Sequence, residues 1–145
     1  MTEIEGLLRI AFAALLGAAV GFDREAHRGS AGLRTHIIVA LGAASFTVMG
    51  VRIVDSAAFE SNNVMLDPTR ILEGIITGIG FLGGAIVFRE GDRTHNVTTA
   101  AGIWAVTGIG IAAGLGYYIL AGGITLLVLI VLYVLQLLKR QPEEQ

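Results

Sequence analysis

The chain has 145 residues, of which 54% are hydrophobic and only 15% are charged, with a formal net charge of -2 and no cysteine. An ordinary soluble domain carries about 25% charged residues, and a chain this short cannot bury so much apolar surface in its own core, so lipid must cover the remainder. The composition therefore predicts a membrane protein, and it argues against disulfides, thiolate metal sites and the basic surface of a nucleic-acid binder.

The first apolar segment predicts a membrane span over about residues 4–22. Its charged residues, Glu5 and Arg9, lie close enough to one end to reach the interface by extending their side chains. A polar loop over residues 23–36 follows, and a second span is predicted over about residues 33–51.

Gly17 and Gly21 of the first span are four residues apart. Glycines at this spacing let another helix approach to backbone contact. The pair predicts close packing within the chain, and a dimer face is the alternative.

The stretch from Asp67 to Glu90 predicts the third span, over about residues 71–88. These residues carry one charge, Glu73, and as a helix they would be about 27 Å long, close to the thickness of the hydrocarbon core. Asp67 is a plausible N-cap for this helix, and Pro68 is a plausible first helical residue.

The third span is also rich in glycine, and its glycines predict where other helices approach. Residues four apart lie on one helix face, so these glycines form two strips that favour helix packing. We therefore expect this helix to be the centre of the protein, packed on more than one side. The strips consist of Gly74 and Gly78, and of Gly80, Gly83 and Gly84.

No charged residue occurs from Val97 to Leu138. One helix of this length would be about 63 Å long, roughly twice the hydrocarbon thickness, so the segment must fold back. Gly114 and Gly116 predict the break, followed by two tyrosines that suit an aromatic belt at the interface. The sequence thus predicts an all-α, polytopic integral membrane protein, a bundle of about five transmembrane helices in one domain over residues 1–145, with spans at about 4–22, 33–51, 71–88, 97–114 and 117–138.

The distribution of basic residues predicts the orientation. Arginine and lysine gather in loop 23–36, in loop 89–95 and in the C-terminal tail, whereas the opposite side has at most Arg9, Arg52 and Arg70. By the positive-inside rule, the two loops and the C-terminus are cytoplasmic and the N-terminus is outside.

No catalytic motif is visible in the sequence, which predicts that the protein is not an enzyme. His27 and His36 are nine residues apart, a spacing that does not place two ligands on one helical turn, and no cysteine can complete a zinc site with them or with His95. We therefore expect no bound metal and no cofactor, and histidines that are solvated or locally hydrogen-bonded.

Opposed charges crowd the loop between the first two spans. Arginines alone would suffice to orient a loop, so the added acids favour ion pairs that clasp the two spans together. A docking surface for a partner is the alternative. The charges are Asp23, Arg24, Glu25, Arg28 and Arg34.

Glu73 is the acid inside the third span, about one turn from its outer end. Arg70 precedes it by three residues on the same helix face, so a pair that faces protein is expected. An ion-conducting or proton-sensing carboxylate is the alternative.

Polar residues also open the fourth span. Thr98 and Thr99 can bond the carbonyls of the previous turn or cap the helix together with Asn96. Trp104 lies about two turns in, where its indole N–H needs an acceptor from a neighbouring helix.

Three runs of sequence resemble the signature blocks of the MgtC/SapB family of membrane proteins, also called YhiD. They are GFDREAHRGSAGLRTHIIVALGAA, DPTRILEGIITGIGFLGGAIVFR and NVTTAAGIWAVTGIGIAAGLGYY, in the same order and spacing over about residues 6–120. The resemblance implies a bacterial inner-membrane protein of about five helices. It also implies a role in adaptation to low magnesium, to acid stress and, in pathogens, to survival inside host cells (virulence).

The resemblance also implies which residues have functional roles. The charged and polar motif positions of the family fall on Arg24, Glu25, Arg34, Thr35, His36, Asp67, Arg70, Thr98, Thr99 and Trp104. Two positions depart from the family pattern: Asp23 stands where leucine is frequent, and Asn96 where glycine is frequent. Many relatives carry a soluble C-terminal domain, and this sequence is expected to have none.

Two functions follow as hypotheses. The first is an interaction protein, expected as a homodimer through its glycine faces, that regulates larger membrane machinery; the resemblance implies the rotary ATP synthase as one target. The second is a small magnesium or proton transporter or channel, supported by Glu73 and by glycines that could interrupt the third helix and expose its carbonyls.

Overall fold

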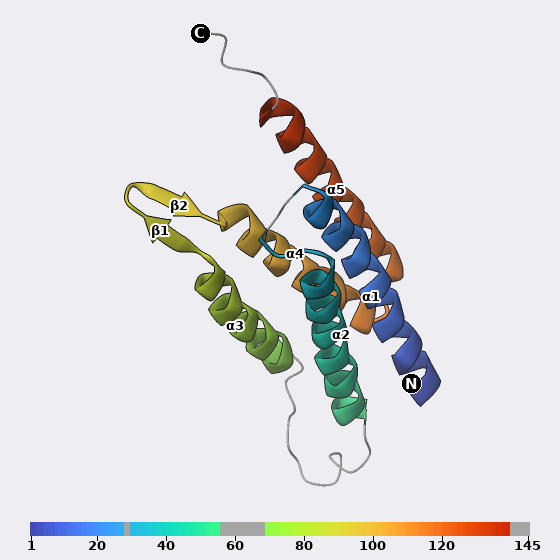
Figure 1. The fold of residues 1–145 in the computed structure, drawn as a ribbon. Helices are drawn as coiled ribbons and strands as arrows, with labels where there is room; N and C mark the ends of the chain where they lie inside the picture. Colours follow the sequence, from blue (N-terminus) through green and yellow to red (C-terminus); the bar gives the residue numbers. More distant parts are fainter. Residues whose placement is uncertain (28–29, 56–68, 140–145) are drawn as a thin grey trace.

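A computed structural model describes residues 1–27, 30–55 and 69–139, with side-chain surroundings up to residue 134. The predicted helix cap at Asp67 and Pro68 lies outside these residues. The described part forms five helices and a short β-hairpin (Figure 1). In chain order they are α1 (Glu3–Ala26), α2 (Leu33–Asp55), α3 (Thr69–Ile86), β1 (Phe88–Glu90), β2 (Arg93–His95), α4 (Val97–Gly114) and α5 (Tyr118–Lys139).

The helices have the lengths and compositions that a membrane requires. α1, α2, α3 and α4 are each long and apolar enough to cross a bilayer, and α5 is apolar over Tyr118–Val134. The predicted all-α membrane bundle is confirmed.

The predicted break near Gly116 is also confirmed. α4 ends at Gly114 and Gly116 has a φ of +85°, a left-handed conformation that glycine adopts without strain. The N–H of Gly116 donates to Ala113 O and the N–H of Tyr117 donates to Ala112 O, both at 2.9 Å, so a Schellman motif satisfies the last carbonyls of α4.

α4 lies at the centre of the bundle and contacts α1, α2, α3 and α5 (Figure 1). Ile103, Val106 and Ile109 on this helix are fully buried. A helix that is apolar on all sides, as α4 is, can be surrounded by neighbours without burying a charge.

The prediction that the third span is the centre of the protein is wrong for the described chain. α3 has no buried residue, and it packs mainly against α4 and, less closely, α2. A methyl group added at Gly74, Gly78, Gly80 or Gly84 would meet nothing within 4 Å, and one at Gly83 would only touch Ala100. A glycine strip permits a close approach, but it does not reveal whether the same chain supplies the neighbour.

Other glycines do make close contacts. A Cβ at Gly17 would lie 2.7 Å from Ala40 Cβ and one at Gly21 would lie 2.8 Å from Leu33 Cα, so this pair packs α1 against α2 within the chain. Gly110 makes the equivalent contact for α4, because a Cβ there would lie 2.5 Å from the carbonyl oxygen of Ala40.

The turn predicted after the third span is a β-hairpin. β1 and β2 pair antiparallel with Phe88 opposite His95, and the two rings stack with centroids 4.9 Å apart. Gly91 in the turn has a φ of +59°. The hairpin joins α3 to α4 and projects from one end of the bundle (Figure 1).

Candidate functional site

Motif residues from three helices meet where α1 ends and α2 and α4 begin. The hydroxyl of Ser30 donates to Thr99 Oγ1 over 3.0 Å, which joins the α1–α2 connection to α4. We call this region the polar junction. It comprises Arg24, Glu25, Ser30, Arg34, His36 and Thr99.

Glu25 holds the start of α2. Its Oε2 accepts a hydrogen bond from the backbone N–H of Leu33, the first residue of α2, over 2.8 Å. The first N–H groups of a helix have no partner inside the helix and carry partial positive charge, so a carboxylate stabilises this end. Glu25 joins the two spans through a backbone N–H of α2, and it forms no ion pair with an arginine among the described residues, contrary to the expectation.

His36 is fully buried, and its ring is held from one side. Nδ1 lies 2.8 Å from the carbonyl oxygen of Gly32. A carbonyl can only accept, so Nδ1 carries the proton and Nε2 is left as an acceptor in the neutral ring. Nε2 is buried and has no partner within the described part of the chain.

Gly102 of α4 provides the space that the His36 ring occupies. Gly102 is buried, and a Cβ there would lie 3.5 Å from Nε2 of His36. α4 therefore contacts the edge of the imidazole ring through a glycine, which has no side chain. His36 is locally hydrogen-bonded, as one alternative predicted, but it is not solvated.

The arginines of the junction differ in exposure. Arg24 is half-buried, and its Nε has no partner among the described residues. Arg34 is exposed on the first turn of α2, beside the half-buried Thr35. Arg28 lies outside the described residues.

The two threonines at the start of α4 face different surroundings. Thr99 is buried and accepts from Ser30, whereas Thr98 is exposed. The preceding residue, Asn96, has a φ of +65° and makes no side-chain cap; its Nδ2 instead donates to Ile86 O over 3.2 Å. The predicted side-chain cap is therefore wrong. Asparagine tolerates this left-handed conformation, so it can stand where the family pattern has glycine.

The remaining predicted residues lie away from the junction. Arg70 and Glu73 are both exposed on α3, and the structure as described shows no ion pair between them, contrary to prediction. Trp104 is 60% exposed on the outside of the bundle, and no described residue accepts a hydrogen bond from its indole N–H, so the predicted acceptor on a neighbouring helix is not found. Asp67 is outside the described residues.

The other histidines make local contacts. His27 Nδ1 lies 2.7 Å from Asp23 O, and His95 Nε2 lies 3.8 Å from a carboxylate oxygen of Glu90. Among the described residues, no three histidine, aspartate or glutamate side chains converge as metal ligands would.

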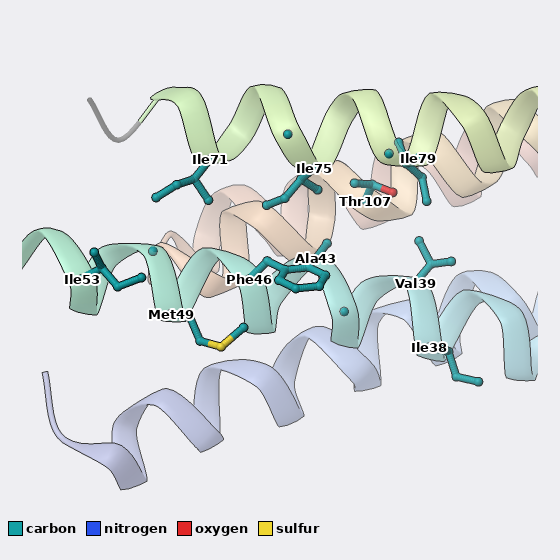
Figure 2. Close-up of a pocket in the computed structure, with 14 residues that line it drawn as sticks. Ile38, Val39, Ala43, Phe46, Met49, Ile53, Ile71, Ile75, Ile79 and Thr107 are labelled. Atoms are coloured by element: carbon teal, nitrogen blue, oxygen red, sulfur yellow. The ribbon is translucent and has the colours of Figure 1, made fainter. Parts of the chain in front are cut away.

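An apolar groove separates α2 from α3. It encloses about 590 Å³, and Ile71, Ile75 and Ile79 point from α3 into it (Figure 2). Val39, Phe46 and Gly50 line the α2 side. Thr107 of α4 lies at its base, with its hydroxyl donating to Ile103 O over 2.9 Å. The groove thus offers an apolar surface at membrane depth.

The comparisons with known proteins agree on one family. A model of the MgtC family matches residues 10–141. Protein MgtC of Brucella abortus is 38% identical over 107 residues, which are 74% of this chain and 41% of that protein. Protein SapB of Bacillus subtilis is 34% identical over 116 residues, 77% of this chain and 48% of that protein.

A third relative, from Escherichia coli K12, is named "Putative magnesium transporter YhiD". It is 34% identical over 128 residues, 86% of this chain and 59% of that protein. The chain therefore spans about half the length of the curated relatives that it matches. No solved structure matches it significantly.

Proposed function

Because the chain belongs to the MgtC family, we propose that it is a small bacterial inner-membrane protein that regulates larger membrane machinery during adaptation to low magnesium or acid. It acts by contact and catalyses no reaction. The rotary ATP synthase is one candidate target. The polar junction faces the cytoplasm, as the distribution of basic residues favours.

The packing of the bundle interior is the observation that carries this proposal. The core consists of alanine, valine, isoleucine and leucine side chains. Thr47, Thr107 and Thr125 are buried within it, and each donates to the carbonyl four residues earlier on its own helix over 2.8 to 2.9 Å. A hydrated ion needs a path lined by polar groups, and this packing favours a protein that works through its surfaces.

Two surfaces are suited to contact. The polar junction presents the exposed Arg34 at one end of the bundle, and the α2–α3 groove presents apolar side chains at membrane depth. Charged groups at the rim of an interface set specificity, whereas apolar grooves supply buried area. Together they support a regulator that recognises a membrane-embedded partner.

Transport is the second candidate function, because the name of the Escherichia coli relative gives magnesium transport. Glu73 is an acidic residue about one turn inside a described span, and it is exposed on α3. Magnesium prefers oxygen ligands, usually one or two carboxylates with several waters. A pathway for magnesium through the protein would therefore have to pass Glu73.

Liposomes decide between the two functions. We expect the purified chain, reconstituted with a magnesium indicator and a pH indicator inside, to admit magnesium and protons no faster than empty liposomes. The same chain should restore growth at low magnesium to a strain that lacks its gene. Flux that Glu73→Gln abolishes, and that the hairpin control Glu90→Gln leaves unchanged, would overturn regulation in favour of transport.

A further inference from the structure

Five residues of α3 form a continuous stripe along one helix face. They are Arg70, Glu73, Thr77, Gly80 and Gly84, separated by three, four, three and four positions. This is the spacing by which residues of one helix face another in a left-handed helix pair. All five are exposed. We call them the α3 stripe.

The chain itself does not cover the α3 stripe in its described part. Ile71, Ile75 and Ile79 lie on the side of α3 that faces α2 (Figure 2). A Cβ at Gly80 or Gly84 would meet nothing within 4 Å. The stripe therefore faces away from the rest of the bundle, at the edge that α3 forms in Figure 1.

Lipid is a poor cover for this surface. A carboxylate inside a membrane-spanning helix is costly against hydrocarbon, and Glu73 makes no ion pair among the described residues. Thr77 also differs from the buried Thr47, Thr107 and Thr125, because within the described chain its hydroxyl has no hydrogen bond to the carbonyl four residues earlier. Both groups have hydrogen-bonding capacity that only another polar surface can use.

We propose that the α3 stripe binds the α3 stripe of a second copy of this chain, with the two helices parallel about a two-fold axis normal to the membrane. Copies inserted in the same orientation place identical residues at the same depth, so the contact is self-complementary. Arg70 of each copy then lies one helical turn or less from Glu73 of the other, which forms two reciprocal ion pairs. Gly80 and Gly84 let the two backbones approach closely.

Charge complementarity selects a second copy as the occupant. The stripe carries one cation and one anion, three residues apart, both exposed and unpaired within the described chain. A second copy at the same depth brings its Arg70 within about one helical turn of Glu73, and its Glu73 equally close to Arg70, so each charge gains an opposite partner from the same sequence. The inference is independent of the proposed function, since a transporter could use the same dimer.

Disulfide crosslinking in native membranes tests the interface directly. The chain has no cysteine, so one substitution introduces the sole thiol. Thr77→Cys, on the axis, should give an oxidised dimer, whereas Gly78→Cys, one residue along and lining the groove, should give none. A Cβ at Gly78 would meet nothing within 4 Å, so a cysteine side chain at this control position is not blocked by the rest of the described chain. Equal crosslinking at both sites, no dimer, or a product with a different protein would overturn the proposal.

Charge exchange tests the reciprocal pairs. Copies carrying Arg70→Glu alone, or Glu73→Arg alone, place like charges together and should co-purify with differently tagged copies of themselves several-fold less than the unmodified chain. Co-expression of one Arg70→Glu copy with one Glu73→Arg copy restores both pairs across the axis and should restore co-purification. If the two residues pair only within one helix, mixing the copies rescues nothing, and that result would overturn the reciprocal contact.

Discussion

Arg9 near the start of α1 donates a hydrogen bond from Nη1 to the carbonyl oxygen of Gly114, 3.1 Å away, at the last residue of α4. The guanidinium also pairs with Glu5 on its own helix, and its side chain is only 15% exposed. The Arg9 side chain therefore lies against the end of α4. It turns inward and stabilises a helix end whose carbonyls carry partial negative charge.

Arg9→Leu should destabilise the bundle. The substitution leaves the buried Gly114 carbonyl without this donor, and an unsatisfied buried acceptor costs about 1–3 kcal/mol. We expect a lower midpoint of thermal unfolding in detergent, followed by circular dichroism. Arg52→Leu is the matched control, because Arg52 is 45% exposed and only approaches Glu3 at 3.6 Å. Equal losses in the two variants would contradict a special role for Arg9.

Gly110→Ala should also destabilise the protein. A methyl group at Gly110 would lie 2.5 Å from Ala40 O and 2.9 Å from Ala43 Cβ, so α2 and α4 must move apart. Overpacking of this kind costs about 1–3 kcal/mol in free energy of unfolding. Gly108→Ala on the same helix has open space and should be neutral or slightly stabilising, since alanine favours helix by about 1 kcal/mol. Denaturant titration of both variants measures the difference, and the idea fails if Gly108→Ala is the more damaging.

The sequence predicted the spans well but not their arrangement. Long uncharged runs bounded by charges, such as residues 97–114, are easy to identify because lipid requires them. Lipid is as apolar as a protein core, so hydropathy does not distinguish Ile103, which is fully buried, from Ile119, which is 94% exposed. The central position of α4 was therefore not visible in composition, and the glycines of α3 suggested the wrong helix.

The sequence predicted the charged and polar residues of the candidate site but not the groups that they contact. Glu25 and His36 stand at positions that the family resemblance marks, yet they contact the N–H of Leu33 and the carbonyl of Gly32. Every residue has such backbone groups, so no sequence pattern indicates which of them a side chain will reach. Ser30 and Gly102 were missed for a similar reason: a small residue is informative only once its neighbour is known.

Glu25→Ala should loosen the start of α2. Loss of a side-chain acceptor at a helix N-terminus costs about 0.5–2 kcal/mol, and the lost negative charge adds to it. Hydrogen exchange followed by mass spectrometry should show faster exchange in the first turn of α2, including the Leu33 amide. Glu25→Gln keeps an acceptor and should fall in between. Unchanged exchange in Glu25→Ala would show that the contact does not hold the helix end.

Arg34→Ala tests whether the polar junction is a contact surface. Arg34 is exposed on α2 and makes no ion pair with any described residue, so its removal leaves the bundle packing unchanged. We expect normal membrane insertion and an unchanged unfolding midpoint, together with loss of growth at low magnesium or in acid. Arg93→Ala in the exposed β-hairpin is the control for general loss of positive charge. If Arg34→Ala cells grow like the parent, the junction does not contact the partner through this residue, because an exposed cation without an internal role can affect growth only through what it touches.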